Sequence, residues 1–203
     1  MEAVDYRYRE ENQDKTVYVD VHCDDIVREL VERSICGDIE AFGELYGIHI
    51  DRIYRYIYYQ VRDKSVSEDL TEEVFLKAWT GIKKFSWKGP PFSSWLYKIA
   101  HNHIVDYFRT SRQLYRLDQS IQANSGNPEE EAEEHVTIKG LMDAIAELPH
   151  QQQQVIILKF IEGLENHEIE GILGKSRGAI RVMQMRALAT LRETLSREPK
   201  NEI

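Results

Sequence analysis

The feature that most constrains this chain is a break at residues 118–138. This stretch has six acidic residues and no Lys or Arg, and residues 124–128 read Asn-Ser-Gly-Asn-Pro. Helix-breaking residues followed by mutually repelling carboxylates favour an extended linker. A chain of 203 residues that is divided there forms two small units rather than one large core.

Both flanking parts show a helical pattern, because their apolar residues recur every three or four positions. The predicted helices run from residue 38, from 65, over 93–112, over 140–148, over 151–161, over 166–173 and from about 177 to 196. We therefore predict an all-α protein of two small helical domains, residues 38–117 and 139–197, joined by a flexible acidic linker.

Details of the pattern predict which faces are buried. In the first long helix the apolar stripe consists of Phe42, Tyr46, Ile50, Ile53, Ile57 and Val61. Three arginines, Arg52, Arg55 and Arg62, fall off that stripe. Ser65 and Glu68 have the spacing of a capping box, which predicts the start of the next helix. The inner edge of the last helix is expected at Ile180, Ala187, Leu191 and Leu195.

Residues 1–37 are predicted to form an N-terminal extension that precedes the first helical domain. The segment 15–23 alternates apolar and polar residues, which is compatible with a short strand or an extended arm. Cys23 and Cys36 lack the paired spacing of a zinc or redox site, so we interpret them as two reduced thiols. Control of this arm by thiol oxidation is the alternative.

The net charge of −9 hides an uneven distribution. Residues 80–117 carry seven basic groups and one acid, and residues 175–197 carry six basic groups and one acid. Two basic islands in an acidic chain are typical of a protein that contacts a polyanion at two separate places.

The first basic island is interleaved with aromatic residues. Phe85 and Trp87 lie on a loop with Gly89 and Pro90, where exposed rings can stack on unpaired bases while cations follow the phosphates. For Trp95, Tyr107 and Phe108, a place in the core is the favoured interpretation.

The second basic island has the pattern of a helix-turn-helix. A short helix, a turn with Gly174 and a longer basic helix follow one another within residues 163–192. Arg177, Arg181 and Gln184 recur at helical spacing, and Arg and Gln are side chains that read guanine and adenine. A solvated basic face would have a similar pattern.

Taken in order, four segments resemble one family. They are DLTEEVFLKAW at 69–79, FSSWLYKIAHNHIVDYFR at 92–109, LPHQQQQVIILKFIEGLENHEIEGILGKSRGAI at 148–180 and RALATLR at 186–192. This set is similar to regions two and four of the extracytoplasmic-function (ECF) sigma factors. The resemblance covers about two thirds of the chain.

The resemblance implies a non-enzymatic initiation factor without cofactor or metal. Its partners would be core RNA polymerase, at the clamp helices of the largest subunit and the flap, promoter DNA, and an anti-sigma factor. The implied polymerase-binding residues are Asp69, Glu72 and Glu73, with Leu70 and Phe75 behind them. The implied minus-10 residues are Phe85, Trp87, Lys88, Lys98, Asn102, Asp106, Arg109 and Arg112. The implied minus-35 residues are Lys175, Ser176, Arg177, Ala179, Arg181, Gln184 and Arg186.

The chain departs from the family pattern at three positions. Glu170 stands where a small Ala is usual, Ala179 where Thr is common, and Glu165 where Ser or Thr commonly caps the helix. These changes all lie in the predicted helix-turn-helix, next to the residues that the resemblance implies for minus-35 contacts.

Two other function classes compete with this interpretation. An enzyme would use His101, His103 and Asp106, but on a helix the two histidines point about 200° apart and leave only two groups on one face. A stand-alone helix-turn-helix regulator of duplex DNA would leave the first basic island without a role. No stretch approaches the roughly 18 to 20 apolar residues that span a bilayer, so we expect a cytoplasmic protein without membrane insertion.

Overall fold

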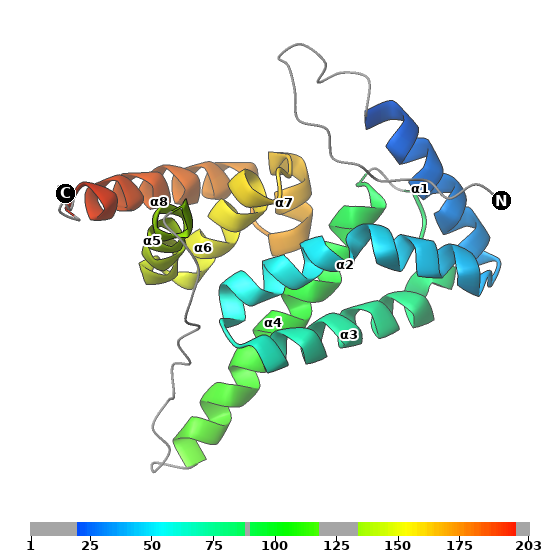
Figure 1. Cartoon of the computed structure of the whole chain (residues 1–203), viewed down its shortest axis with the longest axis horizontal. Coiled ribbons are helices and arrows are strands. Elements are labelled where there is room, and N and C mark those ends of the chain that lie inside the picture. Colours follow the sequence, from blue (N-terminus) through cyan, green and yellow to red (C-terminus); the bar gives the residue numbers. More distant parts are fainter. Residues whose placement is uncertain (1–19, 88–89, 118–133, 198–203) are drawn as a thin grey trace.

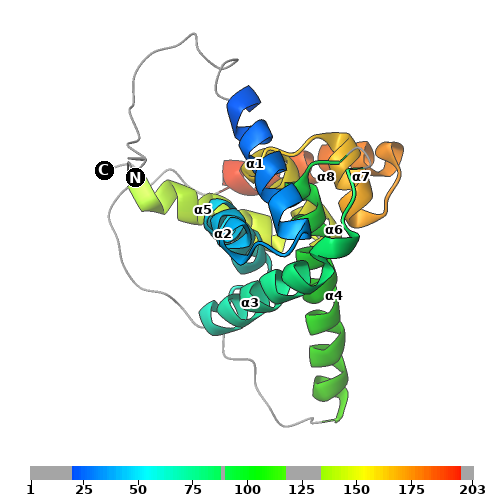
Figure 2. The same ribbon diagram turned by 90° about the vertical axis from the view of Figure 1, so that its right-hand side faces the viewer.

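The computed structural model describes residues 20–87, 90–117 and 134–197, and within these ranges it contains helices and no strand. Figure 1 shows two groups of helices side by side, with α1 to α4 in one group and α5 to α8 in the other. In both views the C-terminal part of α4 extends away from the remaining helices (Figures 1 and 2). The all-α prediction is confirmed.

The first group is built around α2 (Ile39–Val61), which packs against α1 (Asp20–Ile35), α3 (Lys64–Gly81) and α4 (Phe92–Leu117). A short 3-10 helix, η1 (Ile82–Lys84), ends α3 and also contacts α1. The core of this group is apolar and closely packed, since Ile57, Val74 and Leu96 have no exposed surface.

The buried face of α2 differs from the predicted one. Ile53 and Ile57 are buried as expected, but Tyr46 is exposed and Phe42, Ile50 and Val61 are only partly buried. The residues that α2 buries are Ala41, Leu45, His49, Ile53, Tyr56, Ile57 and Gln60. The face is rotated toward α4 and the second group of helices, so that polar and small residues enter the core in place of apolar ones.

The prediction of a strand or extended arm at residues 15–23 is wrong for the part that the structure describes. Residues 20–23 lie in α1, and residues 15–19 are outside the described residues. Leu30 and Val31 of α1 are buried against the core of the first group. An amphipathic helix with a tertiary partner overrides the local period-2 pattern.

The predicted capping box at Ser65 is also wrong. The N-cap of α3 is Asp63, whose side chain accepts a hydrogen bond from the Val66 amide at 2.9 Å, while Ser65 lies inside the helix. Asp is as good an N-cap as Ser, so the first suitable side chain after α2 determines the start.

The second group contains α5 (Glu134–Glu147), α6 (His150–Ile156), α7 (Asn166–Leu173) and α8 (Arg177–Arg197). A π-helical segment, η2 (Ile157–Ile161), continues α6. Helix α5 begins at residue 134, so the last part of the predicted linker is helical, while residues 118–133 lie outside the described residues. Ile180, Ala187 and Leu191 of α8 are buried as predicted, whereas Leu195 is exposed beyond the end of the core.

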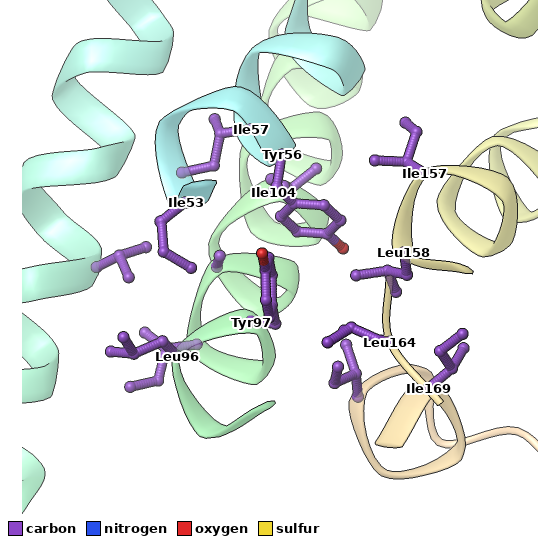
Figure 3. Close-up of a cluster of buried hydrophobic side chains, with 14 of the residues drawn as sticks. Ile53, Tyr56, Ile57, Leu96, Tyr97, Ile104, Ile157, Leu158, Leu164 and Ile169 are labelled. Carbon is purple, nitrogen blue, oxygen red and sulfur yellow. The ribbon is translucent and has the colours of Figure 1, made fainter. Parts of the chain in front are cut away.

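The two groups share one continuous set of buried apolar side chains. Figure 3 shows Tyr56 and Tyr97 between Ile53 and Leu96 of the first group and Leu158 and Leu164 of the second. Helix α4 packs against α7, and α2 packs against α5, α6 and η2. The two units are therefore in direct contact, a relationship that the sequence did not predict.

Candidate functional surfaces

The exposed face of α3 carries a cluster of carboxylates. Asp69, Glu72 and Glu73 are exposed, while Leu70 and Phe75 lie in the core directly behind them. The solvent-facing apolar side chain beside them is Leu76, which is 66% exposed. Leu76 therefore lies on the same exposed side of α3 as the carboxylates, and the sequence analysis did not single it out.

The aromatic residues of the loop after α3 pack on one another. The Phe85 ring lies 5.2 Å from the Trp87 ring and 5.5 Å from the Phe92 ring, measured between centroids. Phe85 and Trp87 remain partly exposed, and Lys88 lies outside the described residues. The Arg28 guanidinium of α1 sits 5.5 Å from the Trp87 centroid, a cation–π contact between α1 and this loop that the sequence did not indicate.

The basic face of α4 is divided into two parts. Asn102, Asp106 and Arg109 are exposed, and Arg109 pairs with Asp106 at 2.9 Å. Arg112 lies in α4, although its side chain is outside the described part. Lys98 is different, because its Nζ donates to the Gly171 and Ile172 carbonyls of α7 at 2.7 and 2.9 Å.

A helix-turn-helix is formed by α7 and α8. Helix α7 ends at Gly174, which adopts a left-handed conformation (φ 63°) that suits glycine, and its N–H bonds the Glu170 carbonyl. The Ser176 hydroxyl then caps α8 by accepting from the Ala179 amide at 3.3 Å. The N-cap of α7 is Glu165, where Ser or Thr is usual, and the Glu168 side chain three residues later accepts from the Glu165 amide at 2.7 Å, as in a capping box.

The predicted minus-35 residues lie along the start of α8. Ser176, Arg177, Arg181 and Arg186 are exposed, while Lys175, Ala179 and Gln184 are partly buried. Arg177 pairs with Glu170 at 2.7 Å, and Gln184 donates to Asn166 Oδ1 at 3.0 Å. The structure thus brings the basic side chains together on one helix and places a carboxylate among them.

A buried polar cluster joins the two groups of helices, and sequence reasoning missed it. The Glu162 side chain has no exposed surface and accepts from Arg55 at 3.0 and 3.1 Å and from Tyr97 Oη at 2.6 Å. Arg52 donates to the Glu162 carbonyl at 2.6 Å. We call Glu162, Arg52, Arg55 and Tyr97 the Glu162 network. The one available signal was that Arg52 and Arg55 lie off the apolar stripe.

The electrostatic surroundings of this network agree with its geometry. The hydrogen bond to Glu162 raises the pKa of the Arg55 guanidinium. Burial, and then the Glu162 carboxylate, raise the pKa of the Tyr97 hydroxyl, so this hydroxyl stays a hydrogen-bond donor. Both shifts favour the protonated forms of Arg55 and Tyr97, which are the forms that donate to Glu162.

The histidines that suggested an enzyme lie apart from one another. His101 Nδ1 lies 3.2 Å from Gln154 Nε2, while His103 Nδ1 lies 3.1 Å from Glu73 Oε2. Within residues 20–87, 90–117 and 134–197, no group of three or more metal-ligating side chains comes together. In the same ranges, none of the helices has both the length and the apolar character needed to cross a bilayer.

Two family models match the two groups of helices. The model for Sigma-70 region 2 matches residues 45–113, and the model for Sigma-70, region 4 matches residues 138–191. The chain is 41% identical over 173 residues to the ECF RNA polymerase sigma factor BldN of Streptomyces coelicolor, covering 82% of this chain and 65% of BldN. It is 30% identical over 162 residues to the ECF RNA polymerase sigma factor SigX of Bacillus subtilis, covering 76% of this chain and 83% of SigX.

Solved structures share the fold. The sigma factor RpoE of Bartonella quintana, solved with the anti-sigma factor NepR, aligns with a TM-score of 0.69 at 20% identity over 79% of this chain and all of that one. CnrH, solved with the cytosolic domain of CnrY, aligns with a TM-score of 0.66 at 23% identity over 86% of this chain and 99% of that one. With both regions matched in order and SigX covered over most of its length, the chain belongs to the ECF family of RNA polymerase sigma factors.

Proposed function

We propose that this chain binds core RNA polymerase and directs it to promoters, with a separate surface for each contact. The observation that carries the proposal is the separation of charge: one helix face is acidic, and two other surfaces are basic. The two DNA contacts need basic surfaces, because DNA phosphates attract cations. DNA phosphates repel the acidic face, which is therefore free for the polymerase contact.

The polymerase contact is assigned to the acidic face of α3. Asp69, Glu72 and Glu73 project to solvent from a helix whose inner residues, Leu70 and Phe75, fix it in the core. We add Leu76 to this surface, since its apolar side chain supplies the area that carboxylates alone do not bury.

The minus-10 contact is assigned to the aromatic loop and the basic face of α4. Extruding a base from the duplex costs a few kcal/mol, and a preformed aromatic surface with cations beside it offsets that cost. Phe85 and Trp87 supply the rings, and Lys98 and Arg109 supply charge. Lys88, Asn102, Asp106 and Arg112 complete the proposed set.

The minus-35 contact is assigned to the helix-turn-helix. The N-terminal residues of a recognition helix reach base edges in the major groove. Arg177 and Arg181 are exposed in the first two turns of α8, and Ser176 caps it. Lys175, Ala179, Gln184 and Arg186 complete this set.

The remaining proposals follow from this role. RNA synthesis belongs to the polymerase, so the chain itself catalyses no reaction. An anti-sigma factor is a further expected partner, since RpoE and CnrH were each solved with another protein bound. The cytoplasm is the compartment in which a protein with these partners acts.

The test is run-off transcription with core polymerase on fragmented genomic DNA of the source organism, with and without the protein. We expect discrete transcripts that require it. Polymerase without the protein is the control for background initiation. The contrary outcome is a protein that does not bind polymerase and does not support new transcripts, but binds duplex DNA by itself with sequence specificity. Such a protein would be a stand-alone regulator.

A further inference from the structure

Helix α1 reaches the loop that carries Phe85 and Trp87 through one arginine. The guanidinium carbon of Arg28 lies 5.5 Å from the centroid of the Trp87 ring. The helix that carries Arg28 is fixed in place, because Leu30 and Val31 are buried in the core and α1 also packs against η1, which directly precedes the loop. The contact therefore joins a firmly packed helix to the loop.

The Trp87 indole is oriented by contacts of its ring. The Phe85 ring packs against it nearly at a right angle (82°), with the two centroids 5.2 Å apart. Within the part of the chain that the structure describes, Trp87 Nε1 is buried and has no hydrogen-bond partner. The orientation of the indole therefore depends on its contacts with Phe85 and Arg28.

Phe85 is itself anchored to the core of region two. Its ring lies 5.5 Å from the Phe92 ring and 5.2 Å from the Trp95 ring, measured between centroids, and Phe92 is buried. A continuous row of contacts thus runs from Phe92 through Phe85 and Trp87 to Arg28. Trp87 stands between Phe85 and Arg28 in this row, so the loss of Arg28 would leave it held from the Phe85 side.

The charge of α1 indicates which role Arg28 has. This helix contains five acidic and two basic residues, and Arg28 Nε lies 3.6 Å from Glu32 Oε1. DNA phosphates are repelled by a helix of that charge. A guanidinium over an indole is attracted by the electrons of the ring face and needs no phosphate. Arg28 is therefore better suited to positioning Trp87 than to contacting the DNA backbone.

We propose that Arg28 is a positioning residue for minus-10 opening, and that its contact with Trp87 holds the loop ready to receive the extruded base. The inference rests on the proposed function, which assigns Phe85 and Trp87 to the minus-10 contact. A loop that is ordered before DNA binds loses less conformational entropy on binding, so more of the stacking energy offsets the cost of unstacking the base. Arg28 lies outside residues 45–113, the range that matches Sigma-70 region 2.

The test measures how tightly the polymerase-bound protein binds one strand of promoter DNA. The probe is a fluorescently labelled single strand with the non-template minus-10 sequence of a promoter mapped by run-off transcription. Arg28→Ala should weaken binding of this strand about two- to fivefold, which is the contribution expected of an exposed cation–π contact. Arg28→Lys keeps a cation over the ring and should retain most of the affinity.

Arg33→Ala is the matched control. It removes the same charge from the same helix, but the Arg33 guanidinium pairs with Asp38 at 2.7 Å, at the start of α2. We expect this variant to bind the strand as the unmodified chain does, and both variants to bind core polymerase normally. Equal losses of strand binding in the two variants would reveal a general effect of charge and would overturn the proposal.

A double-mutant cycle decides whether Arg28 acts through Trp87. Trp87→Leu alone should weaken strand binding, because it removes a ring on which a base can stack. In that background Arg28→Ala should cause no further loss, since the ring that it positions is gone. Losses that multiply would mean that Arg28 contacts the DNA directly, which contradicts a positioning role.

The contact itself can be measured in the isolated protein. Incorporation of 5-fluorotryptophan gives one ¹⁹F signal for each of the three tryptophans, and Trp87→Phe identifies the signal of Trp87. Arg28→Ala should shift and broaden this signal, whereas Arg33→Ala should leave it unchanged. If Arg28→Ala also leaves it unchanged, Arg28 does not position Trp87 and the proposal is wrong.

The spectrum needs neither polymerase nor DNA, so this proposal and the proposed function can fail separately. If the unmodified protein with polymerase does not bind the strand, the proposed function fails, and the role of Arg28 in promoter opening fails with it. If the unmodified protein binds the strand and Arg28→Ala binds it equally well, only the role of Arg28 is wrong.

Discussion

Arg177, the first residue of α8, donates from Nε to Oε1 of Glu170 on α7 at 2.7 Å. The pair joins the two helices of the helix-turn-helix and places a negative charge beside a side chain proposed to contact the minus-35 element. DNA has to compete with that carboxylate for Arg177. Glu170 is also a position at which the sequence departs from the usual small residue of the family.

We therefore predict that Glu170→Gln raises the affinity of the polymerase-bound protein for minus-35 DNA about three- to tenfold and steepens its salt dependence by up to about one unit of slope. Fluorescence anisotropy with labelled promoter DNA over a range of salt concentrations measures both. Glu193→Gln, an exposed carboxylate much farther along α8, is the matched control. Equal affinities for the Glu170 variant and the unmodified chain would show that the pair does not compete with DNA.

The acidic face of α3 and the start of α8 should be separable by mutation. Glu73→Lys reverses one charge of the proposed polymerase contact and should weaken binding to core polymerase. Arg181→Ala should leave that binding intact but lower affinity for promoter DNA by roughly 1 to 3 kcal/mol. Polymerase pull-down and promoter titration of both variants give the comparison. Similar losses of polymerase binding in both would contradict the assignment of separate surfaces.

The start of α3 can be tested by stability. Asp63→Ala removes the hydrogen bond to the Val66 amide and should lower the free energy of unfolding by about 1 kcal/mol. Ser65→Ala, two residues later at an exposed site in the helix, should change it by less than about 0.5 kcal/mol. Urea denaturation followed by circular dichroism measures both. A larger loss for the Ser65 variant would restore the capping box that the sequence suggested.

Acid should favour separation of the two regions. Burial, followed by the positive charges of Lys98, His150 and Lys175, lowers the pKa of His101 to about 4 where the two groups of helices pack together. If the two groups separate, this pKa returns toward its ordinary value of 6.5. Separated groups then bind a proton that the packed arrangement excludes, so the contribution of His101 to the packing is complete above pH 6.5 and is lost as the pH falls toward 4.

Single-molecule fluorescence transfer from pH 7.5 to 5 checks this expectation, with one dye on the exposed Cys36 and the other at Glu193→Cys on α8 in a Cys23→Ser background. His101→Gln cannot titrate and should flatten the pH profile. His49, whose pKa burial also lowers to about 4, lies inside the first group of helices, so its protonation affects folding of that group. Circular dichroism over the same pH range separates unfolding from domain opening. A profile unchanged in the His101 variant would assign the acid response to other groups.

Several elements followed directly from the sequence. The apolar spacing predicted helices at the positions of α3, α4, α7 and α8, since helix periodicity is a local property. Gly174 ended α7 as predicted because a left-handed turn is cheapest for glycine. The acidic face of α3 and the basic start of α8 were also visible, because exposed charge patterns need no partner to define them.

Other features depended on contacts between distant residues. The sequence predicted Tyr46 on the buried face of α2, whereas packing against α4 and η2 selected Tyr56 and even the polar Gln60. The helix at residues 20–35 formed because Leu30 and Val31 find a core there. Neither outcome can be read from local periodicity.

By itself, the sequence determined that this protein is helical, where its two regions lie and which surfaces carry which charge. The tertiary structure alone decided that the two regions close on each other. Closure depends on Glu162 meeting Arg55 across 107 positions in the chain, with Tyr97 as a third partner. A local sequence pattern predicts that a charged residue such as Glu162 is exposed. Its burial is stable only when the surrounding fold supplies hydrogen-bonding and charged partners, and those partners come from distant parts of the chain.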